Sequence, residues 1–395
     1  MLQVLVEPIK QEFDLSDTQI GLVGGLAFAV LNVVLSVWIA RYAERAHRLS
    51  LVSIGTVLWS IATAVCGFAN SFFTLALARI GVGVGEAVGL PSTISLVADY
   101  FPIRERGRAM SVLMLAAPIG AFVGPVAAAM IAEPYGWRAA FWLASAPGFL
   151  LAILLYLLCR EPERGRHDKV EALGEKVPSM SAVVRRLLGR HSLRHFLIGS
   201  TVACIVGFGV NMFLAAYFQR QHGLGLAEAG ILTGLVASVP ATISVIGSGW
   251  LCDKLATRDA RWFGYIPGAA LLLAAPLYIA AVANPSTLMA VALFALAAIF
   301  QYTYMVPGPT ATQNMMHPQM RATASSLIGV AYGLGSGVGP LLVGWLSDCF
   351  GRTDAAAGLK WALSVTALGY LWAALHFFLG ARRVREEMAL PIDDV

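Results

Sequence analysis

Charge is scarce in this chain. Only 13% of its 395 residues are Asp, Glu, Lys or Arg, whereas 58% are hydrophobic and the mean hydropathy is +0.71. Soluble domains carry about a quarter charged residues, so this composition excludes a soluble globular protein. It predicts an all-α integral membrane protein, with most of the chain inside the bilayer.

Groups that carry metal or covalent chemistry are missing as well. The five cysteines lie in or at the ends of apolar runs, without a CxxC pair or neighbouring histidines, so metal and disulfide roles are not expected. The sequence has no HExxH motif and no Ser/His/Asp set, and we expect no enzyme and no cofactor beyond a proton gradient. No basic stripe is interleaved with aromatic residues, which argues against binding of nucleic acid.

Apolar runs of about 20 residues predict membrane-spanning helices. Eleven such runs are present, at residues 17–40, 49–68, 72–98, 107–132, 139–159, 195–217, 226–251, 262–282, 286–306, 322–347 and 359–380. Of the 28 Lys and Arg residues, 22 fall on one side of these spans. Because basic loops stay in the cytoplasm, we expect a multi-pass protein of a bacterial inner membrane with a cytoplasmic C-terminus.

The segment before the first complete span is short. Residues 2–9 look like the last turns of a helix, and the positive-inside rule would place Met1 outside the cell. We therefore expect that most of a first transmembrane helix is missing from this chain. A genuine eleven-span protein with an external N-terminus is the alternative.

Two halves of the sequence repeat one plan. At an offset of 209 residues, four positions recur as Gly21/Gly230, Gly25/Gly234, Glu44/Asp253 and Arg45/Lys254. At an offset of 215, three more recur as Gly120/Gly335, Gly124/Gly339 and Pro125/Pro340. Repeated halves with a site between them at the bilayer midplane are typical of one transporter architecture. The predicted organisation is an N-terminal bundle at 1–160, a linker at 161–194, a C-terminal bundle at 195–385 and a cytoplasmic tail at 386–395.

The linker contains an amphipathic segment. Ser179 can cap a helix that places valines and leucines on one side and Arg185, Arg186 and Arg190 on the other. We expect this helix to lie along the inner leaflet, where anionic lipid attracts it.

A charged turn follows the first complete span and recurs in the second half. An acid followed by bases at a tight turn can pair with a neighbouring helix end, so we expect a latch on the cytoplasmic side, made of Glu44, Arg45, Arg48, Asp253 and Lys254. An ordinary positive-inside loop would explain the bases but not the repeated acid.

With these motifs the chain resembles the major facilitator superfamily along essentially its whole length. The run GWLCDK (249–254) matches that family's turn between the second and third helices of a half, and GWRAAF (136–141) resembles the start of its sixth helix. The N-terminal turn is degenerate, since Glu44 replaces the usual aspartate and Trp38 falls near the usual glycine. Gly120, Gly124 and Pro125 resemble the antiporter-type glycine and proline motif of the family's fifth helix. Together with their repeats Gly335, Gly339 and Pro340, they are expected to serve packing and hinge motion.

Within that superfamily the runs RIGVGVGEAVGLP (79–91) and FDLSDTQIGL (13–22) resemble the spinster branch. The resemblance implies transport of lysophospholipids or sphingoid phosphates, with proton coupling suspected for bacterial relatives. It also implies that Arg79 and Glu86 act together with an acid on the first helix, which would lie upstream of Met1.

Arg79 and Glu86 stand out from the residues alone. They lie seven residues apart in an apolar span, so both project from one helix face, and buried charges in a bilayer usually face a polar cavity. Desolvation and the nearby arginine act in opposite directions on the proton affinity of Glu86. An anionic substrate could engage Arg79 and leave Glu86 to protonate. A static ion pair that fixes helix packing is the alternative.

The second half contributes a different wall. Residues 262–320 contain no Asp, Glu, Lys or Arg, and the polar candidates for substrate contact are Asn211, Gln301, Tyr302 and Tyr304. Interhelical hydrogen bonds are the competing interpretation of these four residues. A charged wall opposite an apolar, aromatic one suits an amphipathic anion.

The sequence thus predicts a proton-coupled transporter that works by alternating access as a monomer, with membrane lipids, protons and a small amphipathic substrate as partners. An efflux pump for hydrophobic drugs or a carrier of organic anions remains open. So does a gradient-independent lipid scramblase or channel.

Overall fold

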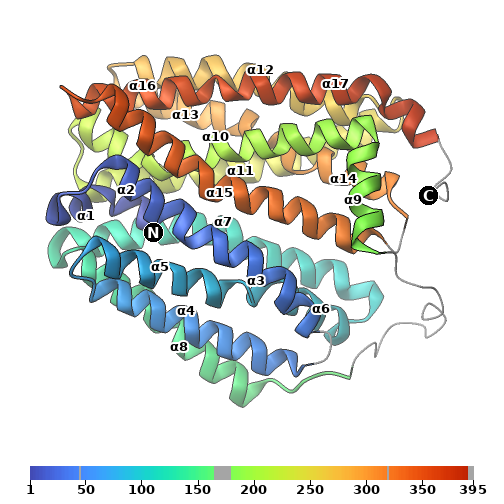
Figure 1. The fold of residues 1–395 in the computed structure, drawn as a ribbon, viewed down its shortest axis with the longest axis horizontal. Helices are drawn as coiled ribbons and strands as arrows, with labels where there is room; N and C mark the ends of the chain where they lie inside the picture. Colours follow the sequence, from blue (N-terminus) through green and yellow to red (C-terminus); the bar gives the residue numbers. More distant parts are fainter. Residues whose placement is uncertain (44–45, 164–178, 318–319, 390–395) are drawn as a thin grey trace.

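The structure, a computed structural model, describes residues 1–43, 46–163, 179–317 and 320–389. These residues form helices and connecting turns without a strand, as the composition predicted. Figure 1 shows two helical bundles side by side, one built from the N-terminal part of the chain and one from the C-terminal part. The all-α fold with two bundles is confirmed.

The N-terminal bundle begins with a short turn and a one-residue link into the first helix. Its elements are η1 (Leu2–Val4), α1 (Val6–Phe13), α2 (Asp17–Gly21), η2 (Leu22–Leu26), α3 (Ala27–Ala43), α4 (Arg48–Gly67), α5 (Phe72–Glu86), α6 (Gly89–Tyr100), α7 (Ile103–Tyr135) and α8 (Trp137–Leu158). The elements α2, η2 and α3 follow one another directly, and η2 is a π-helical turn inside this long helix. Such turns are rare and often lie at functional sites.

The C-terminal bundle is preceded by the linker helix. Its elements are α9 (Met180–Gly189), α10 (His191–His222), α11 (Leu226–Ala256), α12 (Trp262–Ala283), α13 (Thr287–Gln301), η4 (Tyr302–Met305), α14 (Pro307–Met315), α15 (Arg321–Phe350), α16 (Ala355–Ala367) and α17 (Gly369–Ala389). Helix α10 starts at His191, inside the segment that the sequence assigned to the linker.

Ten helices in the described part of the chain are long and apolar enough to cross a membrane. The remaining predicted span, the third in chain order at 72–98, is divided into α5 and α6. The two residues between them, Ala87 and Val88, keep helical backbone angles. The helix is therefore not sharply bent at this interruption, which falls directly after Glu86.

The two ends of the molecule differ. The linker end, on the right in Figure 1, holds α9, the start of α10 and the end of α17, whereas the opposite end holds the start of α2 and the ends of α10 and α15. We name this opposite end the closed end. Helix α9 crosses the linker end and packs on α10 and α15.

Ser179 caps α9 as expected, accepting a hydrogen bond from the Ala182 N–H. The predicted division of faces is wrong at two positions. Arg186 is buried and Leu188 is exposed, because the buried face follows Val183, Arg186 and Leu187 at the helical spacing against α10 and α15.

Two equivalent interfaces join the bundles. A Cβ atom added to Gly21 would lie 2.3 Å from the Pro340 carbonyl oxygen, and one added to Gly230 would lie 3.2 Å from the Pro125 carbonyl oxygen. The glycines repeated at an offset of 209 thus face the prolines repeated at an offset of 215, each across to the other bundle. The repeat in the sequence is the trace of this reciprocal packing.

Only part of the expected glycine packing is present. Gly335 and Gly339 lie tightly against α10, where an added Cβ would come within 2.5 Å of Cys204 Cβ and 2.2 Å of the Ile205 carbonyl oxygen. A Cβ at Gly120 or Gly124 would meet nothing within 4 Å. The close contact expected for these two glycines is wrong. Helix α7 packs on the second bundle through Phe122, Pro125, Val126, Ala129 and Glu133, which share one helix face, and Gly120 and Gly124 lie on the opposite face. Pro125 and Pro340 lie inside unbroken helices.

Candidate functional site

A cavity of about 190 Å³ lies between the two bundles. The first bundle contributes Gly24, Phe28 and Arg79, and the second contributes Phe208, Asn211, Met212, Ser336 and Pro340, together with the N-terminal residues Met1, Leu2 and Gln3. The cavity thus has one cationic wall and one wall of apolar and neutral polar groups.

The glycines of α5 place Arg79 in this cavity. An added Cβ would lie 2.3 Å from the Phe28 carbonyl oxygen at Gly83 and 2.5 Å from the Trp59 backbone nitrogen at Gly85. Because these two glycines have no side chain, α5 can pack closely against both α3 and α4. These glycines are thus contacts between helices, and the packing brings Arg79 beside Phe28.

The guanidinium of Arg79 has no hydrogen bond or ion pair with any residue that the structure describes. Its Cζ lies 5.0 Å from the centre of the Phe28 ring, a cation–π distance. Its Nε is buried and has no hydrogen-bond partner. Leaving such donors unmatched is costly, so Arg79 is a group to which a ligand in the cavity would bind favourably.

Glu86 does not form the ion pair that the alternative of a static pair requires. Seven residues separate the two Cα atoms by about 10 Å along a helix, and the side chains of Arg79 and Glu86 stay beyond ion-pair distance. Glu86 is exposed at the end of α5, and it is not among the residues that line the cavity beside Arg79.

The four predicted contacts of the second half divide into two groups. Asn211 lines the cavity and donates from Nδ2 to the Tyr302 hydroxyl at 3.2 Å. Gln301 and Tyr304 are buried, and they bond to the hydroxyl of Tyr278 and the thiol of Cys204. In this structure these two residues make the hydrogen bonds inside the second bundle that the competing interpretation expects, and their contact with substrate stays a prediction.

A network of charges joins the bundles at the closed end. Arg220 of α10 donates to Asp17 at 2.7 and 2.8 Å and to Glu7 at 2.7 Å. Asp17 also accepts from Lys10 at 2.6 Å and from the Ser347 hydroxyl at 2.6 Å. Asp17 is 1% exposed, so this is a buried network whose loss on one side would leave unpaired charge.

A second contact at the same end uses a helix terminus. The carboxylate of Asp348 on α15 accepts from the N–H groups of Asp17 and Thr18 at 3.0 and 2.8 Å and from the Thr18 hydroxyl. A carboxylate at a helix N-terminus satisfies free N–H groups and the helix dipole. One bundle thus caps a helix of the other. Glu7, Asp17, Arg220 and Asp348 together form what we name the closed-end lock.

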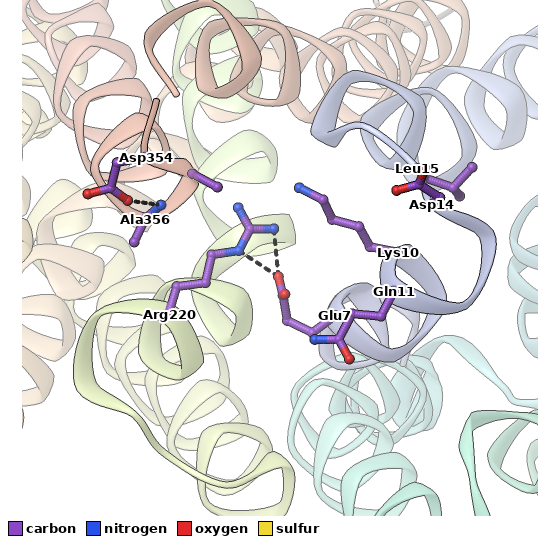
Figure 2. Close-up of a pocket in the computed structure, with 9 residues that line it drawn as sticks. Glu7, Lys10, Gln11, Asp14, Leu15, Arg220, Asp354 and Ala356 are labelled. Carbon is purple, nitrogen blue, oxygen red and sulfur yellow. Dashed lines mark hydrogen bonds and ion pairs between the residues drawn. The ribbon is translucent and has the colours of Figure 1, made fainter. Parts of the chain in front are cut away.

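A pocket of about 430 Å³ lies at the lock. Figure 2 shows Arg220 reaching from the second bundle to Glu7, with Lys10 and Asp14 on the side of the first bundle and Asp354 on the side of the second. The lock and this pocket were not predicted. In the sequence, the run that contains Asp17 indicates only a resemblance to the spinster branch. Nothing local connects Asp17 with Arg220.

The first bundle has its own bonds at this end. Glu12 accepts from the Trp137 indole at 2.7 Å and from Arg138 at 2.6 Å. The hydrogen bond from Arg138 lowers the pKa of Glu12 below its usual value. The motif GWRAAF therefore ties the start of α8 to α1.

The expected latch at the linker end does not join the bundles in this structure. Arg48 is 2% exposed and donates to Asp99, to Ser95 and to Glu161. Asp99 and Ser95 belong to its own bundle. Glu161, which the sequence assigned to the linker, follows α8 closely and bonds to the start of α4, so we count it with the first half. Lys254 lies over the ring of Trp250, and Asp253 is exposed. Glu44 and Arg45 lie outside the described residues. In this structure Arg48, Asp253 and Lys254 therefore form no latch between the bundles, and the cytoplasmic latch stays a prediction for another conformation.

Residues 1–340 match the family model for the Major Facilitator Superfamily. The chain belongs to the major facilitator superfamily. The family expected from the sequence is therefore confirmed, and with it a multi-pass membrane transporter.

Two comparisons refine this membership. An efflux pump of the superfamily from Mycolicibacterium smegmatis is 30% identical over 98% of this chain and 89% of its own length. The crystal structure of a bacterial homologue of the human lysosomal transporter spinster, inward-facing and unoccupied, matches with a TM-score of 0.91 and 28% identity over 99% of this chain and 94% of that one. The crystal structure of the same homologue in an inward-facing occupied state matches with a TM-score of 0.86. The resemblance of this transporter to the spinster branch is thus confirmed.

Proposed function

We propose that the protein is a proton-coupled secondary transporter that moves an amphipathic anion, of the lysophospholipid or sphingoid type, by alternating access. The observation that carries this proposal is the unpaired guanidinium of Arg79 in a cavity between the bundles. An anionic headgroup would supply the missing acceptors, and Phe28, Phe208 and Met212 would line the start of an acyl chain.

Glu86 is the proposed proton carrier. It lies on the same helix and face as Arg79, is exposed, and is free of hydrogen bonds to the described residues. When an anion engages Arg79, the positive charge near Glu86 is neutralised and protonation becomes easier. Binding of the substrate and binding of the proton would then favour each other, which couples their movement.

The proposed orientation places the linker end in the cytoplasm of a bacterial cell, at the inner membrane, with the lock facing outward. Basic residues concentrate at the linker end. The lock then holds the outside shut, which agrees with the similarity to an inward-facing structure. The transporter is proposed to act as a monomer, with protons, membrane lipid and substrate as its partners.

A second candidate is an efflux pump for hydrophobic drugs or a carrier of organic anions. The relative at 30% identity, described as an efflux pump, favours it. A third, a lipid scramblase, would use the same cavity without a gradient and without Glu86.

The test is uptake of labelled 1-oleoyl-glycerol-3-phosphate into proteoliposomes with an imposed pH gradient. We expect the parent to concentrate the lipid, Glu86→Gln to lose concentration but keep equilibration, and Arg79→Gln to lose both. Glu163→Gln, which changes an exposed carboxylate outside the cavity, is the matched control. Accumulation by Glu86→Gln equal to that of the parent would contradict the proton role. Equilibration without accumulation by the parent would favour the scramblase.

A further inference from the structure

We propose that Asn211 selects substrates that carry a hydrogen-bond donor, a hydroxyl or an ammonium group, beside their anionic group. The proposal rests on the function proposed above, since it concerns the second half of the same cavity. It adds the chemistry that the wall opposite Arg79 recognises.

The orientation of the Asn211 amide is fixed by its neighbours. Its Nδ2 lies 2.9 Å from the Gly207 carbonyl oxygen and 3.2 Å from the Tyr302 hydroxyl. A carbonyl oxygen can only accept, so the amide NH₂ must face Gly207. In the flipped orientation the Asn211 Oδ1 would face the Gly207 carbonyl oxygen, and two acceptors would repel each other. Both donors of Asn211 are therefore used inside the second bundle.

The Oδ1 of Asn211 is left over. It accepts no hydrogen bond from the residues that the structure describes, and Asn211 lines the cavity. Arg79 offers only donors. The cavity thus presents a cationic donor on one bundle and a neutral acceptor on the other, and a ligand that satisfies both needs an anionic group and a donor group.

Two other polar side chains of the cavity also carry an acceptor. The Ser336 hydroxyl donates to the Gly333 carbonyl oxygen, which leaves its own oxygen free to accept a hydrogen bond. Gln3 is the second amide in the cavity, but no hydrogen bond fixes which of its ends faces the ligand. A cavity of about 190 Å³ is smaller than sites that enclose drug-sized ligands, so it would hold a headgroup, whose two polar groups then lie within reach of both walls.

Recognition from both bundles has a consequence for transport. A ligand held only by Arg79 binds one bundle, whereas a ligand held also by Asn211 bridges the two. Because a ligand shifts a conformational equilibrium only by its differential affinity for the states, the bridging donor would couple occupancy to closure around the substrate.

The experiment compares ligand pairs that differ by one hydroxyl. The pairs are 1-oleoyl-glycerol-3-phosphate with its 2-deoxy analogue, and malate with succinate, each measured for binding in detergent and for uptake into proteoliposomes. The parent should prefer the hydroxylated member about tenfold, the effect of one net hydrogen bond. Asn211→Leu should bring this ratio to about one by weakening only the hydroxylated member.

Two further variants guard against a merely structural effect. Tyr302→Phe removes one partner of the amide but leaves the bond to Gly207, and should retain most of the preference. Asn211→Asp should weaken binding of both members of each pair. It should strengthen binding of 1-oleoyl-lysophosphatidylethanolamine, whose ammonium group can pair with the new carboxylate.

The outcomes separate this inference from the proposed function. Uptake that depends on Arg79 but shows no hydroxyl preference, or a preference that Asn211→Leu retains, overturns the inference alone. A preference for malate over succinate with no lipid carried supports the inference and overturns the lipid substrate. Failure of all four ligands to bind overturns both.

Discussion

Two buried arginines at opposite ends of the molecule make a natural comparison. Arg220 at the closed end and Arg48 at the linker end each bond to two carboxylates, and their side chains are 9% and 2% exposed. The partners of Arg220, Glu7 and Asp17, belong to the other bundle. The partners of Arg48, Asp99 and Glu161, belong to its own half.

The difference teaches that the same chemistry can serve two purposes. A buried charge network is costly to break on one side. In the proposed alternating-access cycle, a network between the bundles stabilises only the state that is closed at this end, because the other state separates its partners. A network within one bundle stabilises every folded state against unfolding, because its partners move together. Arg220 should therefore set the conformational equilibrium, and Arg48 the stability of the first half.

Replacing each arginine by glutamine is the strongest way to break this comparison. Removing one partner of a buried pair costs about 3 to 5 kcal/mol. Arg220→Gln should shift the equilibrium toward a state open at the closed end, by a hundredfold or more. Arg48→Gln should lower the free energy of unfolding by a similar amount and leave the equilibrium unchanged.

The equilibrium can be measured by the distance between spin labels at Gln11 and Thr353, two exposed residues of different bundles at the closed end, after replacement of the exposed Cys159 and Cys349. Stability is measured by thermal unfolding in detergent. An unchanged label distance in Arg220→Gln, or a shifted one in Arg48→Gln, would refute the division of roles.

How far the sequence predicted this arrangement depends on the range of the interactions. The spans and the two halves follow from local patterns, namely hydrophobic length and repeats. The lock joins Asp17 and Arg220, which are 203 residues apart, and no periodicity relates them. Arg48 was predicted as a latch residue from a loop motif, but the motif does not reveal that its carboxylate partners lie in the same half.

The candidate site shows the same limit. Arg79 was identified because a charge inside an apolar span is energetically costly and usually has a function. Asn211, Gln301, Tyr302 and Tyr304 were equal candidates, and only packing separates them: the hydroxyl of Tyr278 and the thiol of Cys204 use up the polar groups of Gln301 and Tyr304. Sequence finds the unusual residue, whereas contacts decide which ordinary polar residue remains available.

Alanine substitutions at two glycines sharpen the comparison by a smaller effect. Gly21 meets the Pro340 backbone across the interface, where an added Cβ would lie 2.3 Å from a carbonyl oxygen, and Gly120 faces open space. Overpacking costs about 1 to 3 kcal/mol, so Gly21→Ala should shift the Gln11 to Thr353 distance toward the open state. Gly120→Ala should leave that distance unchanged and stabilise α7 by up to about 1 kcal/mol. Equal responses of the two variants would show that the interface tolerates an added methyl group.

The smallest expected effect is a pH dependence at the linker end. Burial alone would raise the pKa of Glu161, but hydrogen bonds from the Leu49 N–H and the Arg48 guanidinium lower it below its usual value of 4.5. A carboxyl group with a lowered pKa stabilises the fold above its unfolded-state pKa, and this contribution disappears as the pH falls through the folded-state pKa. Glu161→Gln should therefore cost about 1 to 3 kcal/mol of unfolding free energy at pH 7, and less at pH 4. The Gln11 to Thr353 distance should not respond, because Glu161 and Arg48 share one half. A cost that is equal at both pH values would mean that packing, and not the charge of Glu161, supports this corner of the first bundle.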